Sequence, residues 1–156
     1  MSSALKEKPS LRFIAIPDII SVALVDNRFP TDSIRSLINE SLEIIYGLRN
    51  FIGNANKFSK KKIEIFLNSD EKITSIIIRD DGPGFPRDLI DKHRLGEPYI
   101  RTADQANISK YGLGLGTFIG KTLLEKNFAN INFNNSEDSG GAEVSIEWKN
   151  KDLKLI

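Results

Sequence analysis

The chain has 156 residues, a length that suits one domain able to bury a hydrophobic core without covalent cross-links. It contains no cysteine, which excludes disulfides, thiolate metal sites and thiol catalysis. Its 22 basic and 21 acidic residues give a formal net charge of +1, which argues against a surface that binds nucleic acid through phosphate neutralisation.

The apolar segments are too short to cross a bilayer. The longest run, FIAIPDIISVALV, is interrupted by Pro17 and Asp18. Because no charged leader precedes an apolar segment, we expect a cytoplasmic protein without membrane contact. We expect residues 1–10 to be disordered and residues 11–156 to form a single domain.

The first half of the chain predicts two short strands and a helix. ISVALV, residues 20–25, is typical of a strand and is followed by the turn residues DNRFP, and a second strand is expected near residues 34–38. From Ser41 to about Ser59 the pattern becomes helical. Its apolar residues recur at i, i+4, i+7 and i+11, on one stripe: Ile44, Leu48, Phe51 and Ala55.

The second half predicts a hairpin, a loop, a helix and two more strands. KIEIFLN and KITSIIIRD, separated by SDE, indicate an antiparallel hairpin, whereas residues 87–110 lack periodicity and predict a mobile loop. Residues 113–126 predict a helix with Leu115, Ile119 and Leu123 on its apolar face, followed by the strands NINFNN and AEVSIEW. The expected strands and helices segregate along the chain and do not alternate strictly. This order favours an α+β fold, a two-layer sandwich with helices on one face of a mixed sheet.

The glycine-rich stretch KYGLGLGTFIGKTLLEKN superficially matches two phosphate-binding loops. A P-loop requires a glycine five positions before the Gly-Lys-Thr at residues 120–122, but Leu115 occupies that place. A Rossmann turn requires a glycine or alanine where Thr117 stands, after a strand, and the preceding residues are polar. Neither the P-loop nor the Rossmann turn therefore fits. Without other motifs, the simplest interpretation is that these glycines cap the start of a helix.

Two further motifs lie upstream. In RDDGPGF, Asp80, Gly82 and Gly84 follow an apolar strand, where a carboxylate could accept a hydrogen bond from an exocyclic amino group of a flat ligand; an ordinary hairpin turn is the alternative. In NFIGNANKFS, Asn50, Asn54 and Lys57 share one helix face, although each Asn alone could be a solvated residue. Two amide oxygens and an ammonium group there suit a magnesium ion held mainly by phosphate oxygens.

In chain order, NFIGNANKFS, RDDGPGF and the glycine-rich stretch resemble the N, G1 and G2 boxes of the GHKL ATPase superfamily. The resemblance is specifically to the catalytic ATP-binding domain of bacterial sensor histidine kinases. The segments YGLRNFIGNANKFS, LGEPYIRT, GLGLGTFIGKTLLE and GGAEVSIEW are most similar to redox-responsive kinases of the RegB/PrrB type. The resemblance covers residues 20–148 and implies the Bergerat (GHKL) fold with an ATP lid.

The resemblance also implies a role for each matching residue. Asp80 would hold the adenine amino group, with Gly82 and Gly84 shaping the base pocket and Phe58 flanking the base. Asn54 would ligate Mg²⁺, and Asn50 and Lys57 would contact phosphates or the metal. Residues 87–111 would be the lid. The remaining candidates are two weaker γ-phosphate contacts in the lid and the G2 box: Arg101, Lys110, Gly112, Leu113, Gly114, Leu115 and Gly116.

Two departures from the family pattern stand out. Gly141-Ala142 replaces the usual Gly-Thr, which puts in doubt a hydroxyl-held water on the adenine. The only histidine, His93, has Arg94 rather than an acidic residue beside it, so we interpret it as a lid residue and not as a phosphoacceptor. The resemblance therefore implies phosphoryl transfer from Mg-ATP to a histidine on a separate dimerisation domain, with a response regulator acting downstream.

Two alternatives remain from the sequence. A stand-alone GHKL serine kinase of the anti-sigma type has nearly this length, but usually has a shorter lid and lacks the NANKF pattern. A non-catalytic module that binds ATP and changes a partner surface through lid order is the other possibility. Retention of both asparagines and Lys57 argues against the second.

Overall fold

The computed structural model describes residues 11–14, 41–98 and 115–153. The strands expected at residues 20–25 and 34–38, and the disorder expected for residues 1–10, lie outside the described residues. The described elements, in chain order, are β1 (Leu11–Ile14), α2 (Leu42–Phe58), β2 (Ile63–Ser69), β3 (Ile73–Asp80), α3 (Arg87–Asp91), α5 (Leu115–Lys126), β4 (Asn130–Asn135), β5 (Ala142–Lys149) and α6 (Asn150–Leu153).

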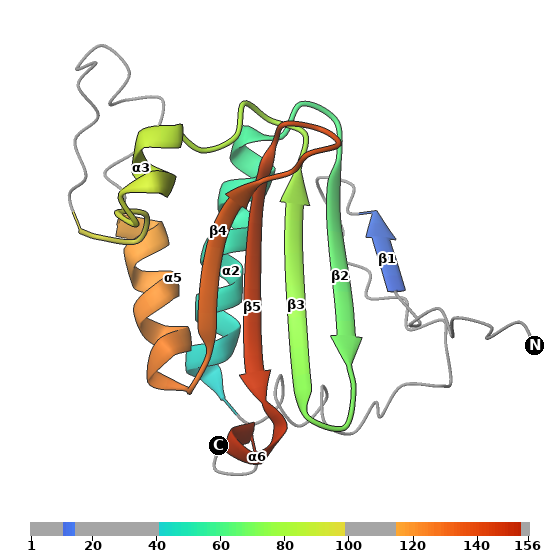
Figure 1. Cartoon of the computed structure of the whole chain (residues 1–156), viewed down its shortest axis with the longest axis vertical. Helices are drawn as coiled ribbons and strands as arrows, with labels where there is room; N and C mark the ends of the chain where they lie inside the picture. Colours follow the sequence, from blue (N-terminus) through green and yellow to red (C-terminus); the bar gives the residue numbers. More distant parts are fainter. Residues whose placement is uncertain (1–10, 15–40, 99–114, 154–156) are drawn as a thin grey trace, which may run out of the picture.

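The described strands form one five-stranded sheet in the order β1-β2-β3-β5-β4. Figure 1 shows α2 and α5 packed on the same face of this sheet, so the expected α+β sandwich is confirmed. The hairpin expected from KIEIFLN and KITSIIIRD is β2–β3. All pairings among the described strands are antiparallel, whereas the sequence had predicted a mixed sheet, and β1 was not predicted.

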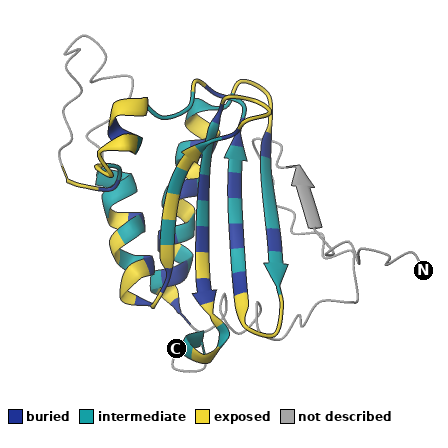
Figure 2. Ribbon diagram, viewed as in Figure 1, coloured by how far each residue is buried: buried dark blue, intermediate teal, exposed yellow. Residues whose placement is uncertain are grey.

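The core lies between the sheet and the two long helices. Alternate residues of β3 and β5 are buried, which Figure 2 shows as dark bands across the strands. Trp148 is fully buried in the core and donates its indole N–H to the backbone oxygen of Asn127 at 3.0 Å. The predicted stripe on α2 is confirmed, because Ile44, Phe51 and Ala55 are buried and Leu48 packs against them. Ser41 caps this helix, as its Oγ accepts from the Ile44 N–H at 3.4 Å.

Helices α2 and α5 approach each other closely through two glycines. A Cβ on Gly47 would lie 2.6 Å from Cγ of Leu124, and one on Gly120 would lie 3.1 Å from the Gly47 carbonyl oxygen. The buried positions of α5 are therefore Gly120 and Leu124. The predicted apolar face of α5 was wrong by one position, because Ile119 is 43% exposed. Because glycine has no apolar side chain, a pattern of apolar residues does not show that Gly120 faces α2.

The loop expected over residues 87–110 is in part a helix. α3 begins after Pro86 and buries Leu89, and a backbone motif closes it: Arg94 N–H donates to the Leu89 carbonyl at 2.9 Å and His93 N–H to that of Ile90 at 3.0 Å. These two bonds form a Schellman cap with His93 in the left-handed region at φ 53°. The helix has only five residues, too few for a sequence period to reveal it.

Candidate functional site

The first part of the candidate site is the end of β3. Asp80 is only 6% exposed, and its Oδ1 accepts hydrogen bonds from the Gly82 N–H at 2.8 Å and the Ala142 N–H at 3.2 Å. Both donors among the described residues therefore reach the same oxygen. Oδ2 is left as the carboxylate oxygen that a ligand donor could use.

Burial raises the pKa of Asp80 above its ordinary value. The two backbone N–H groups act in the opposite direction, since they stabilise the charged carboxylate. The neighbouring carboxylate of Asp81 has a further, raising effect. A buried acceptor held in a fixed orientation by the backbone is suited to recognising an amino group.

Two glycines let other backbone segments come against this carboxylate. A Cβ on Gly82 would lie 2.4 Å from the Phe58 carbonyl oxygen at the end of α2, so the turn after β3 rests directly on that helix. A Cβ on Gly141 would lie 1.9 Å from the Asp80 carbonyl oxygen. No larger residue fits at Gly82 or Gly141 without backbone movement. This close approach explains why a glycine stands at residue 141.

The turn that follows is fixed from β4. Asn135 accepts from the Phe85 N–H at 2.7 Å through Oδ1 and donates to the Phe85 carbonyl at 2.9 Å through Nδ2. Gly84 has φ 76°, and a Cβ there would lie 2.7 Å from Oδ1 of Asn135. Gly82 and Gly84 therefore allow the close packing of this turn, while their role in shaping a base pocket stays a prediction.

The second part of the site is the face of α2 that meets the start of α5. Gly116, in the first turn of α5, has Oδ1 of Asn50 3.4 Å and Oδ1 of Asn54 3.7 Å from the point where its Cβ would lie. Asn54 Nδ2 donates to Thr117 Oγ1 at 3.1 Å, while Asn50 Nδ2 donates to the Tyr46 carbonyl at 2.8 Å. Both amide oxygens therefore lie beside a helix N-terminus, an environment that favours anions.

These residues fit a magnesium ion of the kind that keeps several waters. The amide nitrogens are engaged by Thr117 and by Tyr46, which leaves the oxygens of Asn54 and Asn50 as possible ligands. Among the described residues, no group of three or more His, Cys, Asp or Glu side chains could hold a metal. Any ion here would therefore depend on amide oxygens, water and the phosphates of a bound nucleotide.

The other sequence candidates are only partly placed. Lys57 is exposed, with Nζ 5.3 Å from the centroid of the Phe58 ring, so both lie at the C-terminal end of α2 beside the turn after β3. Leu115 is the first residue of α5. Five candidates lie outside the described residues: Arg101, Lys110, Gly112, Leu113 and Gly114.

Three supporting residues were not predicted from the sequence. Asn135 and Thr117 act through contacts with segments far away in the chain, 50 and 63 positions from their partners, and no local pattern marks them. Asp81 accepts from the backbone N–H groups of Lys60 and Lys61 at 2.8 to 3.1 Å and ties the turn to the segment after α2. The adjacent aspartates of RDDG were a visible signal for this role.

Residues 39–152 match the profile of the family described as histidine kinase-, DNA gyrase B- and HSP90-like ATPases. The chain belongs to this ATPase family. The predicted membership of the GHKL ATPase superfamily is thereby confirmed, and Asp80 and Asn54 both lie within the matched residues.

Several sensor kinases are similar to this ATPase domain. The sensor histidine kinase RegB of Cereibacter sphaeroides is 40% identical over 101 residues, which cover 62% of this chain and 21% of that protein. The putative NtrY-like sensor histidine kinase of Rickettsia prowazekii is 33% identical over 94 residues, covering 60% and 14%. The sensor protein QseC of Escherichia coli K12 is 31% identical over 103 residues, covering 65% and 21%. The matched part of the chain thus spans about a fifth or less of these relatives.

Solved structures show the same fold. The mycobacterial sensor histidine kinase MprB superimposes with a TM-score of 0.56 at 24% identity, over 67% of this chain and 70% of that one. The catalytic domain of histidine kinase ThkA gives 0.55 at 23% identity, over 69% and 67%. The ATPase domain described here therefore has the fold of histidine kinase catalytic domains. None of its described helices has the length and apolar character needed to cross a membrane.

Proposed function

We propose that the chain is the ATP-binding catalytic domain of a two-component sensor histidine kinase. It would transfer the γ-phosphoryl group of Mg-ATP to a histidine on a separate dimerisation domain. Membership of the ATPase family and the similarity to RegB, NtrY-like and QseC sensors support this proposal. A solved neighbour, ShkA, is described in complex with AMPPNP, with a TM-score of 0.54 at 24% identity, over 68% of this chain and 21% of that one.

The observation that carries the proposal is the orientation of Asp80. Because Oδ1 is occupied by two backbone N–H groups, Oδ2 would accept the adenine amino group. Guanine presents a carbonyl oxygen at that place, so two acceptors would face each other without a proton between them. We therefore expect ATP to bind well and GTP poorly.

The two parts of the site are joined by α2. Asn54 and Phe58 are one helical turn apart, about 6 Å along the axis. A nucleotide with its base against Asp80 and Phe58 would run along α2, with its phosphates toward Asn54, Asn50 and the N-terminus of α5. Gly82 and Gly84 would shape the base pocket, and Gly112, Leu113, Gly114, Leu115 and Gly116 would form the phosphate-facing segment.

The chemistry proposed for this site relies on position and charge. Mg²⁺, when bound, would supply positive charge that neutralises the negative charge developing on the phosphates during transfer. Asn54 would hold the ion, with Thr117 fixing the orientation of its amide. Asn50 and Lys57 would contact the phosphates or the metal, with Arg101 and Lys110 as further γ-phosphate contacts. The domain would contribute no covalent intermediate.

The proposal extends to the surroundings of the domain. Residues 11–156 would form one catalytic unit in the cytoplasm, where ATP is available. Its partners would be the histidine-bearing dimerisation domain of its parent kinase and, indirectly, a response regulator, with no role for nucleic acid or membrane contact. His93 would not be the phosphoacceptor, since it serves as the left-handed cap residue of α3 and has no acidic neighbour in sequence.

A labelling experiment tests the proposal. The chain with Mg²⁺ and γ-labelled ATP should bind nucleotide but retain almost no label, with or without His93→Ala. Adding the dimerisation domain encoded with it should yield acid-labile, base-stable label on that partner. Acid-stable label on a partner serine would favour the anti-sigma type of kinase. ATP binding without transfer to any histidine-bearing partner would favour a non-catalytic module.

A further inference from the structure

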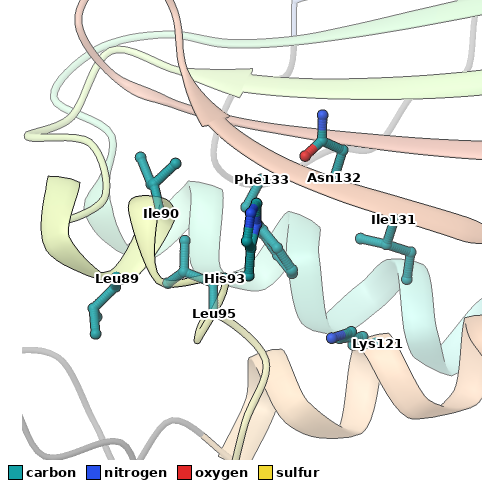
Figure 3. Close-up of a pocket in the computed structure, with 8 residues that line it drawn as sticks. All are labelled: Leu89, Ile90, His93, Leu95, Lys121, Ile131, Asn132 and Phe133. Carbon is teal, nitrogen blue, oxygen red and sulfur yellow. The ribbon is translucent and has the colours of Figure 1, made fainter.

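A cavity lies between the end of α3, the middle of α5 and strand β4. Its volume is about 80 Å³. Figure 3 shows apolar side chains around it, from Leu89, Ile90, Leu95 and Phe133. Four of its lining residues, Leu89, Ile90, His93 and Leu95, lie in the segment predicted to be the ATP lid, but none of the lining residues is among the proposed contacts to the base, the phosphates or the metal.

The wall formed by the α3 segment is held by backbone geometry. The Schellman cap at His93 turns the chain back over Leu89, and Gly96, at φ 83°, then crosses the side chain of Lys121. A Cβ on Gly96 would lie 2.5 Å from Cδ of Lys121. The segment therefore rests on the lysine stem, and both ends of the turn are fixed.

The polar groups at this cavity are cationic or can donate hydrogen bonds. Lys121 and His93 line it, together with the amide of Asn132. The ion pair of Lys121 with Glu125 on its own helix spans 3.8 Å, which is too long for a hydrogen bond, and leaves the ammonium protons for another acceptor. Among the residues that the structure describes, the side chains lining the cavity are apolar, amide or basic, and none is acidic.

The edge of β4 adds backbone donors. The Ser136 N–H donates to the Gly141 carbonyl at 2.8 Å, so even-numbered residues of β4 face β5 in the ladder. Antiparallel alternation then directs the N–H and C=O groups of Ile131 and Phe133 away from β5, toward the side of β4 on which no other described strand pairs. Both residues line the cavity.

We propose that this cavity binds a small aliphatic monocarboxylate. The carboxylate would lie against Lys121, His93 and the outward-facing N–H groups of β4, and the alkyl chain against Leu89, Leu95 and Phe133. A cavity of 80 Å³ is about half the size of one that encloses benzene, which limits the ligand to about two to four carbons. The site does not depend on the proposed kinase function.

The test uses the full 156-residue chain and butyrate as the probe, followed by amide NMR. Butyrate should give saturable shifts at Leu95, Ile131 and Phe133, with a millimolar dissociation constant, as expected for so small a ligand. Butyramide and n-butanol, which have the chain without the charge, should bind much more weakly. Lys121→Gln should weaken butyrate binding about tenfold or more.

Two variants control for folding and for general charge. His93→Asn keeps a residue that tolerates the left-handed cap, so the turn should persist while butyrate binding weakens. Lys92→Gln removes a positive charge from the neighbouring exposed position and should leave binding unchanged. Shifts that do not saturate, equal binding of n-butanol, equal shifts with chloride or sulfate, or equal loss in Lys92→Gln would each overturn the proposal.

Discussion

Replacing Asp80 by asparagine exchanges one oxygen for an NH₂ group at almost constant volume. The backbone N–H groups of Gly82 and Ala142 both need an acceptor at the Oδ1 position, 2.8 and 3.2 Å away. The new amide must therefore keep its oxygen there and present its NH₂ group where Oδ2 was. Toward an adenine amino group this places a donor against a donor. The loss of a hydrogen bond to a charged acceptor costs about 1.5 to 3 kcal/mol, which is about 10- to 150-fold in affinity.

Calorimetric titration with Mg-ATP measures this loss directly. Asp81→Asn is the matched control, because the Asp81 carboxylate accepts from the backbone of Lys60 and Lys61 and not from Gly82 or Ala142. Asp81→Asn should lower the thermal stability but leave the dissociation constant of ATP unchanged. Equal ATP affinities for the wild type and Asp80→Asn would refute the assignment of Oδ2 to the base.

Asp80→Asn, which should weaken ATP binding, should become more stable relative to the wild type as the pH rises. Burial raises the pKa of Asp80 in the folded chain, so this group favours folding most at low pH and loses that contribution as the pH rises through its folded-state pKa. The amide of Asp80→Asn does not titrate. Its stability relative to the wild type should therefore increase from acidic to neutral pH in denaturant titrations, and a constant difference would contradict this origin of the shift.

Further predictions concern the metal, the turn and one exposed ion pair. Thr117→Val removes the partner of the Asn54 amide and should weaken Mg²⁺-dependent ATP binding by about 10- to 100-fold, the range found for residues that support a metal ligand. Asn54→Ala should remove the Mg²⁺ dependence of ATP binding, with little change in the circular dichroism spectrum. Gly141→Ala forces a Cβ against a backbone carbonyl and should lower the free energy of unfolding by about 3 kcal/mol. Gly53→Ala, exposed in α2 with no atom near, should instead raise it by about 0.5 to 1 kcal/mol in urea titrations. The hydrogen bond from Lys126 lowers the pKa of Glu43, so Glu43→Gln should destabilise the domain at neutral pH, and the difference should vanish as the pH falls through the acidic range.

Much of the fold could be predicted where a sequence period coincides with burial. The stripe of α2 was found because each of its buried apolar residues repeats at helical spacing. The stripe of α5 was wrong because its closest contact is made by Gly120, which counts as no apolar residue, while Ile119 is exposed. The absence of a side chain is what allows the contact, and a pattern of side chains cannot report it.

The site divides in the same way. Asp80 and the α2 asparagines were identified because their motifs are continuous in sequence. Asn135, which holds both backbone groups of Phe85, lies on a strand whose asparagines all look alike in the pattern NINFNN. Only the fold of β4 onto the turn after β3 shows that this residue faces inward and has a partner.

The turn beside Asp80 is assembled from segments far apart in the chain, with a consequence for how the domain opens. The bonds of Ala142 to Asp80 and of Asn135 to Phe85 join residues 62 and 50 positions apart. The first bond lies directly beyond the last β3–β5 pair, Arg79 with Glu143, and the second starts from Asn135, which pairs with Ala142 in β4–β5, so both adjoin the strands that carry the centre of the core. Local fraying should therefore spare this corner, and its amide protons should exchange only when the whole domain unfolds. Saturating nucleotide, at about 100 times its dissociation constant, should then slow the exchange of buried amides in β3 and β5 together, by the factor of about 100 that linkage allows.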